Sequence, residues 1–300
     1  MASILSLHNI SKSYGRIQAL SNVSFDVPQG SVFGILGPNG SGKTTLLGVV
    51  MDVLLASDGS YRWFGKPPGE KLRREIGTLL ETPNFYHYLS ARHNLEITAS
   101  IKKKPVADID RVLKLVRLYE RKDSKFQTYS LGMKQRLAIA SCLLGDPSVL
   151  VFDEPTNGLD PSGIAEIRQL IIDLAGAGKT IILASHLLAE VEKVCTHVAI
   201  LQQGLLVRSG EVHEVLSQEE WIELGTAELE KLEALLTSLP GLEKVLRSGN
   251  HFQVYFKNPT PDAAWLNRVC FDQGIVLDFL QVKKVSLESA FIELTNHASN

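Results

Sequence analysis

Few features of secreted, membrane-spanning or nucleic-acid-binding proteins occur in this sequence. It has only three cysteines in 300 residues, Cys142, Cys195 and Cys270, and no pair of them has CxxC spacing. That usage argues against a disulfide framework and predicts three buried thiols in a reducing cytoplasm. No stretch reaches the roughly 18 uninterrupted apolar residues of a spanning helix, and residues 1–10 lack the basic start and apolar run of a signal peptide. If the protein serves a membrane, we therefore expect other chains to cross it.

Charge is nearly balanced, so the electrostatic footprint of a nucleic-acid-binding protein is missing. The chain has 31 lysines and arginines against 33 aspartates and glutamates, a formal net charge of −2. Without a basic excess, we expect no nucleic-acid partner. With 44% hydrophobic and 21% charged residues, the chain should be globular and well packed, as one large domain or a medium domain plus a small one.

Hydrophobic periodicity predicts an α/β fold for the first two thirds of the chain. Apolar and polar residues alternate in residues 4–7 and 23–27, as in half-buried antiparallel strands. More continuous apolar runs predict buried strands at residues 31–36, 149–152 and 180–184, and helical composition follows the first of these over residues 44–55. Strands that alternate with helices indicate a mainly parallel sheet core, preceded here by antiparallel strands.

A helical insertion is expected within this core, over about residues 82–145. Ser90 precedes a helical segment at residues 91–101, and Ser130 is a candidate N-cap for another at residues 131–144. Between them, one helical face carries four apolar residues, Ile109, Val112, Leu113 and Val116.

The pattern changes near residue 220, where we expect a small α+β domain to begin. Residues 221–224 read as a strand, 226–238 as a helix, and 242–247 and 251–256 as a hairpin around Ser-Gly-Asn. A helix starting at Pro261 and a strand at residues 275–282 complete a β-α-β-β-α-β order, which is typical of ferredoxin-like domains. The expected domains are therefore 1–219 and 220–300.

One loop has the chemistry of phosphate binding. Its sequence, Gly37-Pro38-Asn39-Gly40-Ser41-Gly42-Lys43-Thr44, matches the P-loop pattern in full and lies between a predicted buried strand and a predicted helix. Glycines let successive backbone N–H groups face anionic oxygens, and the helix N-terminus adds its positive dipole end. We expect Lys43 to reach the β- and γ-phosphates of a nucleoside triphosphate, Thr44 to ligate Mg²⁺, and Thr45 to lie beside the phosphates. The motif alone does not separate kinases, GTPases and motors.

A second group of residues has the chemistry of hydrolysis. The apolar run at residues 149–152 ends in Asp153 and Glu154. Beside a P-loop, Asp153 can hold Mg²⁺ and Glu154 can act as general base toward the attacking water, whereas two solvated acids would be the better interpretation without it. His186 ends another buried run, in the place of a γ-phosphate sensor. A lone histidine is more often a packing residue, but this context favours a catalytic one.

Further motifs resemble those of one family. Tyr129-Ser130-Leu131-Gly132-Met133 precedes the Asp-Glu pair at the distance of the signature motif of ABC ATPases, and Asn157-Gly158-Leu159-Asp160 resembles their D-loop. Tyr14 matches the aromatic residue on which the adenine stacks. Six ordered motifs carry the resemblance over about residues 3–217.

The resemblance implies a P-loop ABC cassette with a composite ATP site. ATP and Mg²⁺ would lie on the P-loop of one copy, and Ser130, the Gly132 backbone and Asp160 of a second copy would complete the site, because a helix N-terminus favours anions. ATP then holds two copies together and its hydrolysis releases them. The expected partners are a second copy or a similar cassette, and multi-span membrane permease subunits. The expected location is peripheral, on the cytoplasmic face of the cell membrane.

Two departures from the family pattern narrow the resemblance. Tyr129, Leu131 and Met133 replace the usual Leu, first Gly and Gln of the signature, while Ser130 and Gly132 are kept. Glu81 stands where most of the family has the Q-loop glutamine, and as an oxygen ligand it is a candidate contact for nucleotide, water or Mg²⁺. Both substitutions are similar to those in ATPases of bacitracin-resistance and lantibiotic-immunity exporters, so an exporter of a drug or antibiotic peptide is expected.

Two other functions compete with this interpretation. A soluble ABC ATPase acting on ribosomes or DNA usually has two fused cassettes, a long coiled coil or a metal cluster, and the sequence shows none of these signals. An ATP-binding regulator that barely hydrolyses would have little use for both Glu154 and His186. The aromatic run at residues 83–88 either packs the helical insertion or receives a cytoplasmic helix of a membrane subunit.

Overall fold

The computed structural model describes residues 2–80, 84–215, 220–257 and 262–284. The described residues divide into two compact units, one up to Val215 and one from Glu220 to Lys284. Because residues 216–219 lie outside the described part, the domain boundary between 1–219 and 220–300 stays a prediction.

The first unit is built on a six-stranded sheet with the order β5-β6-β7-β3-β8-β9. Its first five strands are parallel and β9 pairs antiparallel with β8. The central strands β3, β6 and β7 are buried at every position, as their unbroken apolar runs predict for a sheet covered on both faces. The strand bounds are Val32–Leu36 (β3), Ile76–Leu79 (β5), Val149–Asp153 (β6), Thr180–Ser185 (β7), His197–Gln202 (β8) and Leu205–Glu211 (β9).

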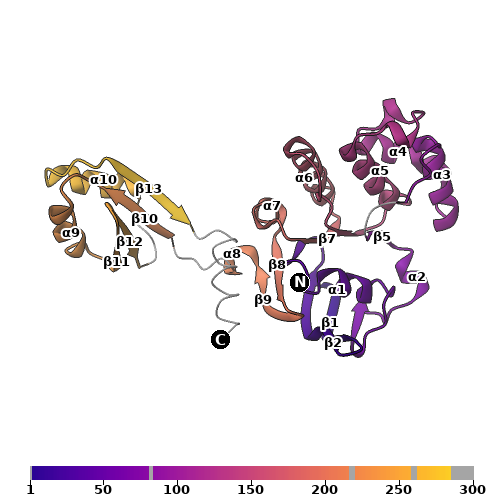
Figure 1. Ribbon diagram of the computed structural model, residues 1–300, viewed down its shortest axis with the longest axis horizontal. Coiled ribbons are helices and arrows are strands. Elements are labelled where there is room, and N and C mark those ends of the chain that lie inside the picture. The colour runs from indigo at the N-terminus through magenta and orange to yellow at the C-terminus, as the bar shows by residue number, and fades with distance from the viewer. Residues whose placement is uncertain (1, 81–83, 216–219, 258–261, 285–300) are drawn as a thin grey trace. The chain divides into compact units, whose positions relative to one another are not determined.

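A second, antiparallel sheet covers one side of this core. Its order is β2-β1-β4, with bounds Ser3–Tyr14 (β1), Ile17–Pro28 (β2) and Asp58–Trp63 (β4). Helix α1 (Lys43–Val50) lies next to this sheet (Figure 1), and apolar side chains of both sheets and of α1 form one hydrophobic cluster. The indole of Trp63, 2% exposed, donates a hydrogen bond of 2.7 Å to the Val50 carbonyl, which anchors the end of α1 to β4.

Three helices of the expected insertion, α3 (Ala91–Lys102), α4 (Ile109–Leu115) and α5 (Leu131–Leu143), lie together (Figure 1). Ser130 caps α5 as predicted and Ser90 caps α3, each accepting a hydrogen bond of 3.3 Å from the backbone N–H three residues on. The other helices of the unit are α2 (Glu70–Arg73), α6 (Pro161–Gly176), α7 (Leu188–Val194) and α8 (Val212–Val215), with 3₁₀ turns at Val106–Asp108, Tyr119–Arg121 and Phe126–Thr128.

The second unit has the ferredoxin-like order that the sequence predicts. Its antiparallel sheet runs β11-β12-β10-β13, and the apolar face of that sheet packs on α9 and α10 around Phe252, Val254 and Leu266. The bounds are Glu220–Gly225 (β10), Leu229–Thr237 (α9), Leu242–Ser248 (β11), His251–Phe256 (β12), Ala263–Asp272 (α10) and Phe279–Lys284 (β13).

Three predicted element bounds differ from those in the structure. Helix α1 ends at Val50 and not near residue 55, because Asp52 takes a left-handed conformation with φ 58° and the chain turns back on Gly48. Helix α9 begins at Leu229, since the hydroxyl of Thr226 instead donates to the Val276 carbonyl at 2.7 Å. The last strand begins at Phe279, because residues 275–277 have no regular secondary structure and the chain bends at Asp278.

Within the described residues, no helix combines the length and the apolar character that crossing a bilayer requires.

Candidate nucleotide site

The P-loop joins the buried strand β3 to helix α1 and is too tightly packed at its start for any side chain. A Cβ on Gly37 would lie 2.3 Å from the Leu201 carbonyl oxygen and 2.4 Å from Ser41 Oγ. A Cβ on Gly40 would meet nothing within 4 Å, so the loop is open on that side. The backbone is therefore held against β8 at one end and left accessible at the turn, where phosphate oxygens can reach its N–H groups.

The first turn of α1 offers uncapped backbone N–H groups. Gly42 occupies the N-cap position in a left-handed conformation, φ 105°, and has no side chain to accept a hydrogen bond. No acidic residue lies in the first turn either. Thr44 is exposed there and Thr45 half-buried. An eight-residue helix with such a start has its positive dipole end free for an anion.

Lys43 reaches back across the loop. Its side chain is 6% exposed, and Nζ donates to the carbonyl oxygens of Gly37 at 2.8 Å and Pro38 at 3.2 Å. Nζ also lies 3.5 Å from Glu154 Oε1. A buried ammonium requires such partners. The N–H groups of this ammonium are also within reach of the loop, where a phosphate would bind.

Three neighbouring parallel strands bring the hydrolytic residues to the same edge as the P-loop. β3, β7 and β6 are adjacent, and their carboxyl ends carry the P-loop, His186 and Asp153-Glu154 respectively. Ligands of open α/β sheets bind outside this edge. Glu154 follows the strand in a left-handed conformation, φ 47°, while its N–H donates to the Ala184 carbonyl at 3.0 Å.

The carboxylate of Glu154 lies between two cationic or polar groups. Glu154 Oε2 is 2.9 Å from His186 Nδ1, and Oε1 faces Lys43. The side chains of Glu154 and His186 are 20% and 36% exposed, so both are accessible to water. A carboxylate held by an imidazole beside a phosphate-binding loop can orient a water molecule and accept its proton.

A pocket of about 300 Å³ opens at this edge of the sheet. It is lined by Gly37, Pro38, Asn39, His186 and Leu188. The pocket brings the predicted loop residues together with the predicted histidine. Leu188 was not predicted; its only signal is its place two residues after His186, at the start of α7.

The predicted Mg²⁺ residues have suitable chemistry. Asp153 is 7% exposed at the end of β6 and Thr44 presents a hydroxyl from the first turn of α1. Carboxylate and hydroxyl oxygens, with phosphate and water, are the ligands that Mg²⁺ prefers. Glu81, the third predicted ligand, lies outside the described residues.

The remaining predicted residues lie elsewhere on the unit. Tyr14 ends β1 with 46% of its surface exposed, and Lys12 Nζ lies 5.1 Å from its ring centroid. Ser130 is exposed at the N-terminus of α5, and Asp160 caps α6 by accepting from the Gly163 N–H at 2.9 Å. Within the part of the chain that the structure describes, neither these residues nor Gly132 line the pocket of Lys43's loop.

Packing explains one of the unusual signature residues. Tyr129 is 4% exposed, its hydroxyl donates to the Arg121 carbonyl at 2.6 Å, and its ring lies 6.2 Å from that of Phe126. Burial raises the pKa of the Tyr129 phenol, so it stays a neutral donor. Leu131, by contrast, is half exposed and touches the turn at Gly158.

The fold and the site together define the class of protein. A parallel sheet whose central strand leads through a glycine-rich loop into an uncapped helix, with two acids at the end of a nearby strand, is a P-loop nucleoside triphosphatase.

Comparisons with known proteins give the family. The ABC transporter family model matches residues 20–157. Bacitracin transport ATP-binding protein BcrA of Enterococcus faecalis is 36% identical over 220 residues, 72% of this chain and 71% of BcrA. Lantibiotic transport ATP-binding protein SrtF of Streptococcus pyogenes is 36% identical over 204 residues, 68% and 89% of the two chains. MJ0796, a bacterial ABC transporter cassette with a dimeric structure, aligns with TM-score 0.63 at 26% identity, covering 69% of this chain and 98% of that one.

The chain belongs to the ATP-binding subunits of ABC transporters. This membership confirms the predicted family, the fold class and nucleotide binding, and with them the ATPase activity of such cassettes. It also confirms the narrower resemblance to bacitracin and lantibiotic transport ATPases.

Proposed function

We propose that this chain is the ATP-hydrolysing motor of an exporter for a drug or antibiotic peptide, and that it works as two copies closing face to face on ATP at the cytoplasmic side of a membrane permease. The observation that carries the proposal is the contact of Glu154 with both Lys43 and His186 beside the P-loop. BcrA and SrtF, named as transport ATP-binding proteins for bacitracin and lantibiotics, support the cargo class.

Each residue of the site has a role in this cycle. The loop N–H groups and the first turn of α1 bind the phosphates, and Lys43 exchanges its contact with Glu154 for the β- and γ-phosphates. Glu154, freed from Lys43, takes a proton from the attacking water while His186 Nδ1 holds the other carboxylate oxygen. Mg²⁺, held by Thr44 and Asp153, would neutralise charge on the phosphates. Tyr14 would stack on the adenine.

The second copy would close the site from the opposite side. Ser130 is exposed at the start of the 13-residue helix α5, next to the Gly132 backbone, so the positive end of this helix is available to the γ-phosphate of a partner. Asp160 caps the neighbouring helix α6 and would face the same interface. The dimeric MJ0796 cassette supports a pairing of this kind.

A groove on the first unit would receive the membrane subunit. It has a volume of about 320 Å³, lies among residues of α2, β5, α3 and the end of α5, and includes the exposed apolar side chains of Val53 and Ile101. Tyr86 and Tyr88, 50% and 65% exposed, pack on one another and present aromatic surface, whereas Phe85 packs on Phe126. Phe85 thus packs within the helical insertion, whereas Tyr86 and Tyr88 would contact the membrane subunit, and Glu81 would couple the groove to the nucleotide.

The proposal is tested by phosphate release from the purified chain, alone and with a co-purified permease. We expect ATP turnover, and a loss of about a hundredfold or more in Glu154→Gln with nucleotide binding retained, because only the proton acceptor is removed. Glu243→Gln, on β11 of the second unit, is the matched control and should keep full turnover. Near-normal turnover in Glu154→Gln would remove this residue from the role of base.

A further inference from the structure

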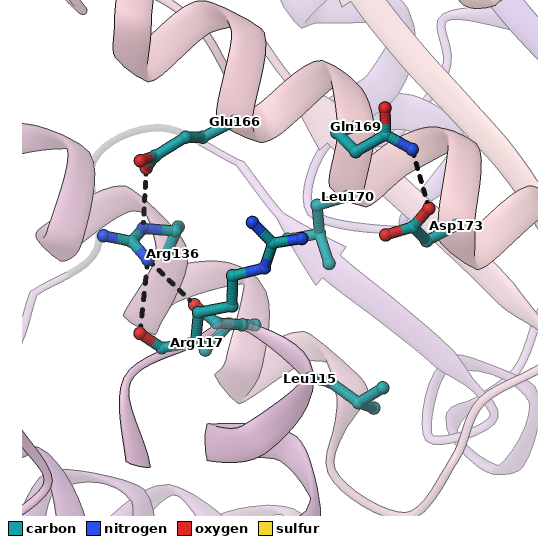
Figure 2. A pocket seen from close by; sticks show the side chains of 8 residues that line it. Leu115, Arg117, Arg136, Glu166, Gln169, Leu170 and Asp173 are labelled. Carbon is teal, nitrogen blue, oxygen red and sulfur yellow. Dashed lines mark hydrogen bonds and ion pairs between the residues drawn. The ribbon is translucent and has the colours of Figure 1, made fainter. Parts of the chain in front are cut away.

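Arg136 joins three helices of the first unit. It projects from α5, and Nη1 donates to the carbonyl oxygens of Val116 at 3.2 Å and Arg117 at 3.3 Å, at the end of α4. Its Nε lies 3.3 Å from Glu166 Oε2 on α6, so one side chain reaches two other helices. Figure 2 shows this guanidinium between the carbonyls of α4 and the carboxylate of α6.

The two helices that Arg136 and Glu166 connect both begin at the proposed interface. α5 starts after Ser130 and α6 after Asp160, the residues that would face the partner's nucleotide. Leu131, the first residue of α5, also lies close to the turn before α6, since its Cδ2 is 3.4 Å from the place where a Cβ on Gly158 would stand. Arg136 thus lies about one and a half turns along α5 from Leu131, and the two approaches together define how α5 stands against α6.

The chemistry of the arginine suits this position. Its side chain is 16% exposed and that of Glu166 47%, so the pair is only partly screened by water. A planar guanidinium can serve two carbonyls on one edge and a carboxylate on another, which a lysine ammonium on a flexible stem does not reproduce. Removing the carboxylate alone leaves a half-buried cation with less compensation.

We propose that Arg136 and Glu166 are positioning residues for the composite site: they hold the helix that carries Ser130 at a set angle to the helix that carries Asp160, so that a second copy meets both at once. Neither side chain touches the P-loop pocket of its own copy. The proposal rests on the proposed ATP-driven pairing of two copies. The proposal predicts that changing these residues alters the affinity of two copies for each other but leaves the nucleotide affinity of one copy unchanged.

The test measures both properties in a hydrolysis-blocked background. Full-length Glu154→Gln is combined with Arg136→Met, Arg136→Lys, Glu166→Gln or the pair Arg136→Met/Glu166→Gln. ATP binding to the single copy is measured by fluorescent nucleotide at low protein concentration, and the dimer dissociation constant by sedimentation in saturating Mg-ATP. Thermal unfolding of every variant is recorded alongside.

We expect ATP affinity of the single copy to stay within about twofold, and the dimer dissociation constant to rise about tenfold in Arg136→Met and severalfold in Glu166→Gln. The dimer of the double variant should dissociate no more readily than that of Arg136→Met, because the two residues act as a unit. Arg136→Lys should pair almost as weakly as Arg136→Met, because an ammonium does not reproduce the contacts of the guanidinium. Gln169→Ala is the matched control: Gln169 lies on α6 in the same pocket, donates to Asp173 of its own helix at 2.8 Å, and its replacement should not alter pairing.

Two outcomes overturn the proposal in distinguishable ways. If the Glu154→Gln parent dimerises and both Arg136→Met and Glu166→Gln dimerise equally well, the positioning role is wrong and the proposed function stands. If the parent itself stays monomeric in ATP, both fail together. Glu166 is half exposed, so Glu166→Gln keeps its fold and decides the question even where Arg136→Met is poorly folded.

Discussion

At the scale of single residues, the backbone conformation of Glu154 places its carboxylate in the site. A non-glycine residue with φ 47° is uncommon and costs of order 1 kcal/mol or more, yet the conformation is held by a backbone hydrogen bond to β7 and by two side-chain contacts. The twist turns the carboxylate from the sheet edge toward Lys43 and His186. The sequence motif shows that an acid follows Asp153, but this turn of the backbone depends on the neighbouring strand.

Replacing Lys43 tests the phosphate-binding role of the loop. Lys43→Ala should weaken ATP binding about tenfold or more, because a charge-assisted contact to phosphate is lost. Isothermal titration calorimetry measures the dissociation constant for ATP. Lys231→Ala, an exposed lysine of the second unit that pairs with Glu228, is the control and should bind ATP normally. An unchanged affinity in Lys43→Ala would contradict the phosphate-binding role of the loop.

At the scale of elements, α4 and α5 are tied together by one carboxylate. Asp108 accepts from the Arg111 guanidinium and from the Gly145 N–H at 2.7 Å, and Arg111 Nη2 also reaches the Leu143 carbonyl at 3.0 Å. The hydrogen bond from Arg111 lowers the pKa of the Asp108 carboxyl. The start of α4 is thereby fixed to the end of α5, the helix that presents Ser130.

Asp108→Asn should therefore destabilise the chain at pH 7 by about 1–2 kcal/mol. A carboxyl whose pKa is lowered by folding contributes fully above its ordinary pKa of 3.8, and the contribution disappears as the pH falls through the lower folded value. Urea unfolding of both proteins between pH 7 and pH 3 should thus show a difference that shrinks below pH 4. Asp123→Asn, an exposed aspartate of the same helical segment, is the control. A pH-independent difference would contradict the linkage.

Sequence patterns predicted elements well where a single periodicity decides the structure. The buried strands before Gly37 and Asp153, and the cap at Ser130, follow from local chemistry and are found in the structure. The contact between Arg136 and Glu166 was not predicted, because it joins helices 30 residues apart in sequence through geometry that no local pattern specifies. The early end of α1 was not predicted either: Asp52 turns the chain out of the helix, and Trp63, on a strand outside the predicted segment, holds the Val50 carbonyl.

At the scale of the whole molecule, the first unit holds both halves of the proposed composite site but keeps them apart. The P-loop and His186 line the pocket and Glu154 contacts both Lys43 and His186, whereas Ser130 and Asp160 lie at helix starts that do not line it. A single copy thus has a complete phosphate-binding loop and a separate, unused anion-favouring helix end. When two copies pair, the phosphate-binding loop of each copy would meet the helix start at Ser130 of the other.

The most direct measurement of this account is sedimentation of Glu154→Gln with Mg-ATP, with Mg-ADP and without nucleotide. The account predicts a dimer in ATP alone, because only a γ-phosphate reaches from the loop of one copy to the Ser130 helix of the other, and it predicts that adding Lys43→Ala abolishes the dimer. A protein that stays monomeric in saturating ATP, even when its permease is present, would contradict the composite site.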